Sequence, residues 1–330
     1  MLVFACVGGA FAFFSWFQTA PEGPEQFLEF EVKKGEGLIA IANNLEKAGV
    51  LTQPKLFVMY AKYKKVDTKV KAGTYGIGLP VSPSNLLNEL VKGQVRLTQF
   101  TVIDGYNKWQ VAEVLEKAFP SVKKQDWLKH MENPALLEGL PGNPKNLEGF
   151  LYPETYKIRS GATPKEILQV MVKQFKSKFS PDFLDMGAKL NLKPYEIVVL
   201  ASIIEKETSV PDERFKVSSV FHNRLKKKMK LQTDPTTIYG MWERYDGNIR
   251  KKDLLEKTPY NTYVIKGLPP GPIASPSKLS LEAAVKPDNT RYLYFVAYGP
   301  SKPGHYFSKS LKEHNQAVYR YQIAPHKKRK

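Results

Sequence analysis

Two carboxylates inside an apolar run are the residues of this chain best placed to do chemistry. The run is Leu200–Thr208, and it contains Glu205 and Glu207. The surrounding segment, Tyr195–Val210, lacks both Gly and Pro and is long enough for a helix. Because ionised groups are costly to desolvate, each acid in such a helix needs either a partner or a chemical task.

A helical wheel separates the two acids. The most apolar face has i, i+3, i+4, i+7 spacing and consists of Ile197, Leu200, Ala201 and Ile204. At about 100° per residue, Glu207 lies roughly 50° from the centre of this face, and Glu205 lies roughly 110° away on the other side. This predicts that Glu207 has the desolvated carboxyl with a raised pKa, as a general acid needs near neutral pH. The adjacent Thr208 could supply a hydroxyl to orient the carboxyl or a substrate.

The same two acids have a purely structural alternative. Both could form salt bridges with Arg214, Lys216 or Lys206, which are nearby in the sequence. In that case neither carboxylate would take part in a reaction, and the helix would only be a charged element of the core.

Composition limits the classes of protein that the chain can belong to. With 330 residues it can bury a full core and is expected to hold two domains. The net charge of +18 predicts attraction to polyanions, such as nucleic acid, anionic lipid or an acidic cell-wall polymer. There is no zinc finger, RNA-recognition signature or Walker loop, so no nucleic-acid partner is expected. The five histidines show no metal-ligand spacing, and we expect no metal and no cofactor. The single cysteine, Cys6, excludes an intramolecular disulfide.

The N-terminus predicts a membrane anchor. From Leu2 to Ala20 the chain carries no charge, and the stretch is about long enough to span a bilayer. A polar, Pro-containing linker follows at 21–29. A secretory signal peptide is the rival interpretation, but no positively charged segment precedes the apolar run. The positive-inside rule cannot orient the span, because only Met1 comes before it.

The segment after the linker predicts a small α+β domain at 30–80. The expected elements are a strand at 27–32, a turn at 33–37, helices at 38–48 and 54–64, and a strand at 71–77. This order, with a glycine turn before the first helix, resembles a LysM-like module, and the resemblance implies glycan binding. The alternative is an adapter that only spaces the rest of the chain from the membrane.

The rest of the chain predicts a connecting α+β segment at 81–140, a larger α+β domain at 141–325 and a basic tail at 326–330. Expected elements are helices at 82–92, 109–119 and 212–229, strands at 94–103 and 291–297, and a hairpin partner or site rim at 305–308. Polar, Pro/Gly-rich sequence at 133–146 suggests the boundary between these segments. Thr233 or Asp234 is expected to cap a short helix. The Pro/Gly loops at 258–263 and 267–273 suit either a sugar groove or plain connectors.

Several motifs in a fixed order give the chain a specific resemblance. They are Glu148–Tyr156, Ala201–Thr208, Leu231–Thr236, Tyr260–Tyr263, Gly267–Ile273 and Tyr292–Val296. With them the chain resembles the membrane-bound endolytic murein transglycosylases of the YceG-like family, from the anchor to about Tyr321. The main departure is the lack of basic residues before the span, which bears on the start codon and on the orientation of the anchor.

The resemblance implies cleavage of the β-1,4 bond between N-acetylmuramic acid and N-acetylglucosamine in peptidoglycan, leaving a 1,6-anhydro end without using water. Hydrolytic glycosidases use two carboxylates, whereas a lytic transglycosylase can work with one. The resemblance also implies action on the periplasmic side of the bacterial inner membrane, beside peptidoglycan synthases (penicillin-binding proteins).

Glu207 is therefore the expected acid/base, with Glu205 and Thr208 in supporting roles. The residues expected to bind substrate are Gln232, Thr233, Asp234, Tyr239, Asn261, Tyr263 and Glu154, although Glu154 could equally be an ordinary surface acid. One alternative is a hydrolytic muramidase that pairs Glu207 with Asp234 or Glu154. The other is a non-catalytic, membrane-anchored scaffold that binds the cell wall.

Overall fold

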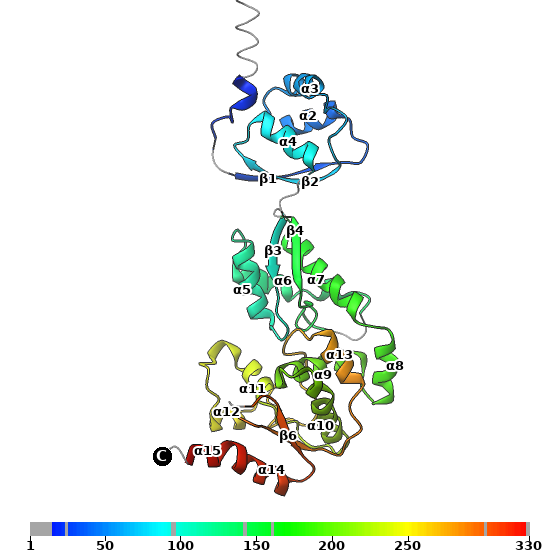
Figure 1. Ribbon diagram of the computed structural model, residues 1–330, viewed down its shortest axis with the longest axis vertical. Coiled ribbons are helices and arrows are strands. Elements are labelled where there is room, and N and C mark those ends of the chain that lie inside the picture. The colour runs from blue at the N-terminus through cyan, green and yellow to red at the C-terminus, as the bar shows by residue number, and fades with distance from the viewer. Residues whose placement is uncertain are drawn as a thin grey trace, which may run out of the picture. The chain divides into compact units, whose positions relative to one another are not determined.

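The computed structural model describes residues 15–23, 26–93, 97–140, 144–159, 162–299 and 302–327. The chain divides into two compact units (Figure 1). Unit 1 comprises residues 1–99 and 156–163, and unit 2 comprises residues 100–155 and 164–330. Both contain helices together with short strands, so the predicted α+β class is confirmed.

The elements of unit 1 are β1 (Gln26–Val32), α2 (Leu38–Lys47), α3 (Pro54–Tyr63), β2 (Gly73–Leu79) and α4 (Pro83–Lys92). The strands β3 (Leu97–Thr101) and β4 (Thr155–Arg159) pair with each other, and the division between the units passes through both. The helices and strands of unit 2 are α5 (Lys108–Ala118), α6 (Lys124–Met131), α7 (Pro164–Lys178), α8 (Asp182–Lys189), α9 (Pro194–Glu207), α10 (Arg214–Lys226), α11 (Asp234–Gly240), α12 (Lys251–Leu255), α13 (Lys278–Val285), β5 (Tyr294–Ala297), β6 (His305–Ser308), α14 (Leu311–Val318) and α15 (Ala324–Lys327). Unit 2 also has 3-10 turns at Pro134–Leu137, Pro211–Glu213 and Trp242–Arg244, and a π-helix at Tyr319–Ile323.

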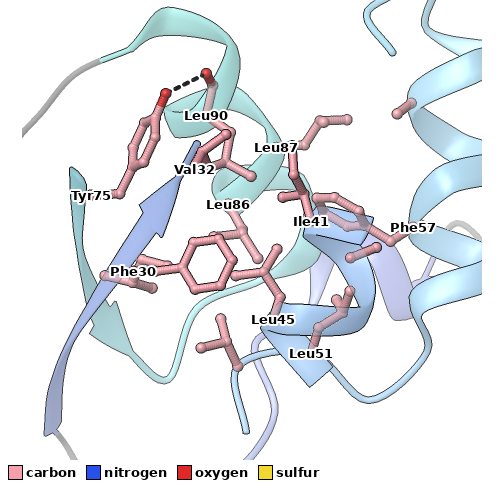
Figure 2. Close-up of a cluster of buried hydrophobic side chains, with 14 of the residues drawn as sticks. Phe30, Val32, Ile41, Leu45, Leu51, Phe57, Tyr75, Leu86, Leu87 and Leu90 are labelled. Atoms are coloured by element: carbon pink, nitrogen blue, oxygen red, sulfur yellow. Dashed lines mark hydrogen bonds between the residues drawn. The ribbon is translucent and has the colours of Figure 1, made fainter. Parts of the chain in front are cut away.

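Unit 1 has the predicted strand–helix–helix–strand order. β1 and β2 are antiparallel, with Phe30 opposite Tyr75. The buried side chains of β1 alternate, as expected for a strand with one face on a core. Figure 2 shows this core, in which the Tyr75 hydroxyl donates a hydrogen bond to the carbonyl of Leu90 at 3.1 Å. The order of elements is thus confirmed, while the LysM-like glycan-binding role stays a prediction.

The helix α4 belongs to this core. Leu86, Leu87 and Leu90 are buried with the side chains of α2 and α3. The sequence predicts a domain that ends at residue 80 and leaves this helix in a connecting segment. The structure extends the unit to include α4, because the apolar face of that helix is part of the shared core.

The predicted anchor at 1–20 falls mostly on residues outside the described part of the chain. Within the described ranges, none of the helices has the length and apolar character needed to cross a bilayer. Phe17, which the sequence assigns to the anchor, is fully buried in unit 1 and stacks against Phe57 and Tyr60. β1 also begins inside the expected linker at 21–29.

The helix α9 lies in the core of unit 2. Proline at its first position, Pro194, suits a helix start, and every residue from Ile197 to Glu205 is buried. The helix ends because Thr208 is extended, with φ −144° and ψ 134°, shortly before Pro211. The Ser202 hydroxyl accepts a hydrogen bond from the amide of Ile273 at 3.0 Å and so fastens the Gly267–Ile273 loop to the helix.

The predicted boundary at 133–146 is not a division between units. Leu137 and Leu147 are buried inside unit 2, near both ends of this stretch. Unit 2 instead begins at Phe100, and it excludes residues 156–163, which belong to unit 1. The predicted hairpin near the C-terminus is confirmed, since β5 and β6 pair antiparallel with Phe295 opposite Phe307.

Candidate active site

Glu207 lies at the C-terminal end of α9, where the buried helix meets open space. It lines a cavity of about 340 Å³ and also a second one of about 330 Å³. One oxygen of its carboxyl, Oε1, accepts a hydrogen bond from the hydroxyl of Thr233. The side chain is half-buried and takes part in none of the ion pairs found within the described ranges. A carboxyl placed in this way can reach a bound molecule.

The surroundings of Glu207 favour its protonated form. Burial raises the pKa of this carboxyl from 4.5 to about 7, and the nearby charge of Asp234 adds to the increase. The Thr233 hydrogen bond and the positive charge of Arg224 act in the opposite direction. A group with a pKa near 7 can both donate and accept a proton at neutral pH, as a general acid and base must.

Glu205 has a different environment from its neighbour. Its Oε1 pairs with Arg214 Nη2 at 2.6 Å, and its Oε2 accepts from the Ser277 amide at 2.9 Å and the Ser277 hydroxyl at 2.5 Å. The helical wheel predicts that Glu207 is the more buried of the two acids. In the structure the order is reversed, with Glu205 buried and Glu207 half-buried. The reason is tertiary, because Arg214 and Ser277 cover Glu205 from outside the helix. The salt-bridge alternative is therefore correct for Glu205.

Thr208 does not orient the catalytic candidate. Its hydroxyl accepts a hydrogen bond from the amide of Val210 at 3.1 Å and donates to Glu213 Oε2 at 3.4 Å. These contacts close the turn after α9. The hydroxyl that holds Glu207 comes from Thr233 instead.

Thr233 belongs to a turn that is braced by the loop after α12. Thr233 occupies the cap position of α11, but its hydroxyl makes no cap hydrogen bond and turns to Glu207. The hydroxyl of Thr262 accepts from the Thr233 amide at 3.0 Å, and the Gln232 amide donates to the Thr262 carbonyl at 3.2 Å. Gln232 has a positive φ of 52°, a strained conformation for this residue type that is common at functional sites.

The 340 Å³ cavity, here called the aromatic pocket, brings together several predicted residues. Its lining is Glu207, Arg224, Leu231, Gln232, Thr233, Asp234, Tyr263, Tyr294, Phe295, Leu311 and His314. The Tyr263 hydroxyl donates to Asp234 Oδ1 at 2.6 Å, which fixes both side chains at the rim. The rings of Tyr263, Tyr294 and Phe295 are half-buried, and aromatic rings next to fixed polar groups are typical of small-molecule and sugar sites.

Asn261, Tyr239 and Glu154 are not brought into this pocket. Asn261 is fully buried, and its amide bonds the carbonyls of Asp253 and Glu256 at 3.0 and 2.7 Å, so it shapes the loop instead. The Tyr239 hydroxyl is buried and donates to Glu148 Oε2 at 3.0 Å. Glu154 is exposed and accepts a hydrogen bond from Gln174 on α7.

The buried carboxyl that Tyr239 contacts is itself perturbed. Burial raises the pKa of Glu148 to about 7, against hydrogen bonds from the Lys108 amide and the Tyr239 hydroxyl. The next residue, Gly149, has φ +82°, and a Cβ there would lie 2.5 Å from Pro272. The motif around Gly149 therefore packs directly against the Gly267–Ile273 loop, and only glycine fits.

Arg224 and His314 also line the pocket, although neither was expected. Arg224 is buried, and its Nε and Nη1 donate to the carbonyls of Leu293 and Leu231 at 2.7 and 2.8 Å. Its guanidinium lies 5.0 Å from the ring of Tyr294, which stacks on His314 at 5.2 Å. The sequence holds a signal for Arg224, which falls seven residues after Val217 on the buried face of α10. His314 comes from α14 and has no such signal.

Comparisons with known proteins agree with one another. A family model described as the YceG-like family matches residues 30–320. A Bacillus subtilis (strain 168) protein named endolytic murein transglycosylase is 34% identical, with 96% of this chain and 91% of that protein covered. A Streptococcus pneumoniae (strain D39) protein of the same name is 29% identical, with 89% of this chain and 58% of that protein covered. A crystal structure of a yceG-like protein from Listeria monocytogenes has a TM-score of 0.60 at 33% identity and covers 89% of this chain and 99% of that one.

Proposed function

The chain belongs to the YceG-like family, and we propose that, like its named relatives, it is an endolytic murein transglycosylase. Its substrate would be the glycan strands of peptidoglycan, cut between N-acetylmuramic acid and N-acetylglucosamine. The observation that carries the proposal is the Glu207 carboxyl. It forms no ion pair with the residues that the structure describes, burial raises its pKa to about 7, and it lines a pocket rich in aromatic rings.

In the proposed reaction, Glu207 is the single general acid and base. Its proton moves to the glycosidic oxygen as the bond from that oxygen to the muramyl C1 breaks. The 6-hydroxyl oxygen of the same muramyl sugar bonds to C1, and its proton passes to the Glu207 carboxylate. The acid is restored, no water is consumed, and the new end is a 1,6-anhydro sugar. The substrate supplies its own nucleophile, so the reaction benefits from a high effective concentration.

The neighbouring residues support this reaction in distinct ways. Thr233 fixes the orientation of the Glu207 carboxyl, and Gln232, Asp234 and Tyr263 supply polar contacts for the sugar. Both carboxylate oxygens of Glu205 are bound, one by Arg214 and the other by Ser277, and Glu205 is not part of the lining of the aromatic pocket. We therefore assign it to holding the end of α9 in place.

One observation favours a second candidate, a hydrolytic muramidase. Asp234 lines the same pocket as Glu207 and could act as the second carboxylate that hydrolysis requires. Against this role, Asp234 Oδ1 is held by the Tyr263 hydroxyl at 2.6 Å. Hydrolysis would leave a reducing end instead of an anhydro sugar.

The location of the activity follows from the substrate. Peptidoglycan lies outside the cytoplasm, and we propose that the N-terminal apolar segment anchors the chain to the inner membrane with both units on the outer side. In that position it would act beside penicillin-binding proteins. Membrane fractionation of cells, with and without residues 1–14, tests the anchor, and release of the full-length protein by salt alone would contradict it.

Strand cleavage by matched variants tests the acid. Uncrosslinked glycan strands are incubated with the wild-type protein, Glu207→Gln and Glu205→Gln, and product lengths are followed by chromatography. We expect Glu207→Gln to abolish cleavage in a folded protein. Internal cuts should give a broad range of lengths, whereas cutting from an end would release disaccharides from the first minutes. Wild-type activity in Glu207→Gln would contradict the assignment.

A further inference from the structure

The second cavity beside Glu207 has no role in the function proposed above. It has a volume of about 330 Å³ and is lined by Asp104, Gly105, Glu205, Lys206, Glu207, Thr208, Ser209 and Arg214. We call it the polar pocket, because unlike the aromatic pocket it contains no ring. Glu207 lines both cavities, so the two are neighbours that share this carboxyl.

Asp104 is the charged residue of the polar pocket to which the described part of the chain offers no hydrogen bond or ion pair. It is presented by a β-turn in which the Tyr106 amide donates to the Ile103 carbonyl at 3.1 Å. Gly105 occupies the third position of that turn with φ +78°, the left-handed conformation that a type II turn needs there. Within the described part of the chain, no hydrogen bond or ion pair to the Asp104 carboxylate is found.

The turn that carries Asp104 is fixed by hydrogen bonds to Ser275 and to Lys206, a residue of α9. The Gly105 amide donates to the Ser275 carbonyl at 2.9 Å, and the Ser275 amide donates to the Tyr106 carbonyl at 2.8 Å. The Lys206 ammonium donates to the Gly105 carbonyl at 3.2 Å. These contacts fix Asp104 relative to the end of α9 without using its own oxygens.

The electrostatics of Asp104 suit a ligand that donates hydrogen bonds. Burial raises the pKa of this carboxyl, Glu205 raises it further, and Arg214 lowers it. Because Arg214 is already paired with Glu205, the polar pocket has little net positive charge to attract an anion. The Asp104 side chain is exposed and no donor to its carboxylate is found among the described residues, so it can accept hydrogen bonds from the hydroxyl and amide N–H groups of a sugar.

We propose that the polar pocket binds the glycan strand on the side of Glu207 opposite the aromatic pocket, with Asp104 accepting hydrogen bonds from an N-acetylhexosamine. This rests on the proposed function. A bond cut in the interior of a strand has a sugar on each side, so an acid that cuts it needs a binding surface in both directions. The aromatic pocket holds one sugar by its rings, and the polar pocket holds the other by hydrogen bonds.

Binding without cleavage tests this assignment. The full-length Glu207→Gln protein serves as the parent, and its affinity for an uncrosslinked glycan hexasaccharide is measured by titration calorimetry. We expect Asp104→Asn in this parent to weaken binding about tenfold, the size of a lost hydrogen bond to a charged group. No charge remains at position 207, so the loss cannot act through ionisation of the catalytic acid.

Asp182→Asn is the matched control, because it removes one carboxylate of the same unit that is exposed and outside both cavities. It should leave the affinity unchanged. Asp104→Ala should weaken binding at least as much as Asp104→Asn, with an unchanged melting temperature for both variants.

The possible failures point to different causes. Unchanged affinity in both Asp104 variants, with a wild-type protein that cleaves strands, would overturn the polar pocket assignment alone. A wild-type protein that does not cleave strands and a parent that does not bind the hexasaccharide would overturn the glycan-cleaving function and this subsite together.

Discussion

Replacing Glu207 with Gln should make unit 2 more stable above neutral pH than the wild-type protein. Burial raises the pKa of this carboxyl from 4.5 to about 7, so the folded protein keeps the proton over a pH range where the unfolded chain has lost it. The wild-type free energy of unfolding therefore falls as the pH rises through that range. A neutral amide at the same position has no such dependence.

The size of the effect follows from the shift in pKa. At about 1.4 kcal/mol per unit, ionising Glu207 in the folded state costs about 3 kcal/mol in total. Between pH 5 and pH 8 the stability difference between Glu207→Gln and wild type should grow by roughly 2.5 kcal/mol. The buried Glu148, whose pKa is also about 7, is present in both proteins and cancels in the difference.

Urea unfolding followed by tryptophan fluorescence measures this difference. Trp109, Trp127 and Trp242 all lie in unit 2, so the signal reports mainly on the unit that contains the site. Glu243→Gln is the control, since Glu243 is exposed, and its difference from wild type should not vary with pH. A flat difference for Glu207→Gln would show that the carboxyl is not desolvated and would remove the physical basis for its role as an acid.

Three further results are expected. Glu205→Gln should lower the free energy of unfolding by about 3–5 kcal/mol, because it leaves Arg214 buried beside a neutral group; a loss below about 1 kcal/mol in chemical denaturation would mean that the pair is dispensable. The activity of the wild type, followed as kcat/KM, should fall as the pH rises through about 7, where Glu207 loses its proton. Thr233→Val should move this fall to higher pH, because the hydrogen bond from Thr233 lowers the pKa of Glu207. Asp234→Asn should move it to lower pH, since the Asp234 charge raises that pKa, and shifts in the reverse directions would refute the electrostatic account.

The elements that sequence reasoning predicts are those set by local signals. The order from β1 to β2 follows from alternation, helical periodicity and glycine or proline at the ends. The helix α7 shows the same kind of signal, with Ile167, Leu168, Met171, Val172 and Phe175 on one face, and could have been predicted. The unit boundaries could not, because whether α4 joins the first core depends on which apolar faces meet in space.

The candidate site likewise contains some residues that the sequence predicts and others that it misses. Glu207 is predicted because a carboxylate in an apolar helix is costly, and Thr233, Asp234 and Tyr263 are predicted because their motifs resemble those of the YceG-like family. The burial of Glu205 depends on a residue that lies 72 positions further along the chain, Ser277, and no helical wheel includes such a contact. Asp104 is missed for the same reason, since only the folded chain brings its turn to the end of α9.

In the proposed reaction, Glu207 alone cleaves the strand and no water is consumed. Mass spectrometry of the products from uncrosslinked strands, incubated with the full-length protein in ¹⁸O-labelled water, tests it most directly. We expect anhydromuramyl ends that carry no label, and no products at all from Glu207→Gln. Reducing ends that carry ¹⁸O would contradict it and would identify a hydrolase with a second carboxylate, for which Asp234 is the first residue to replace.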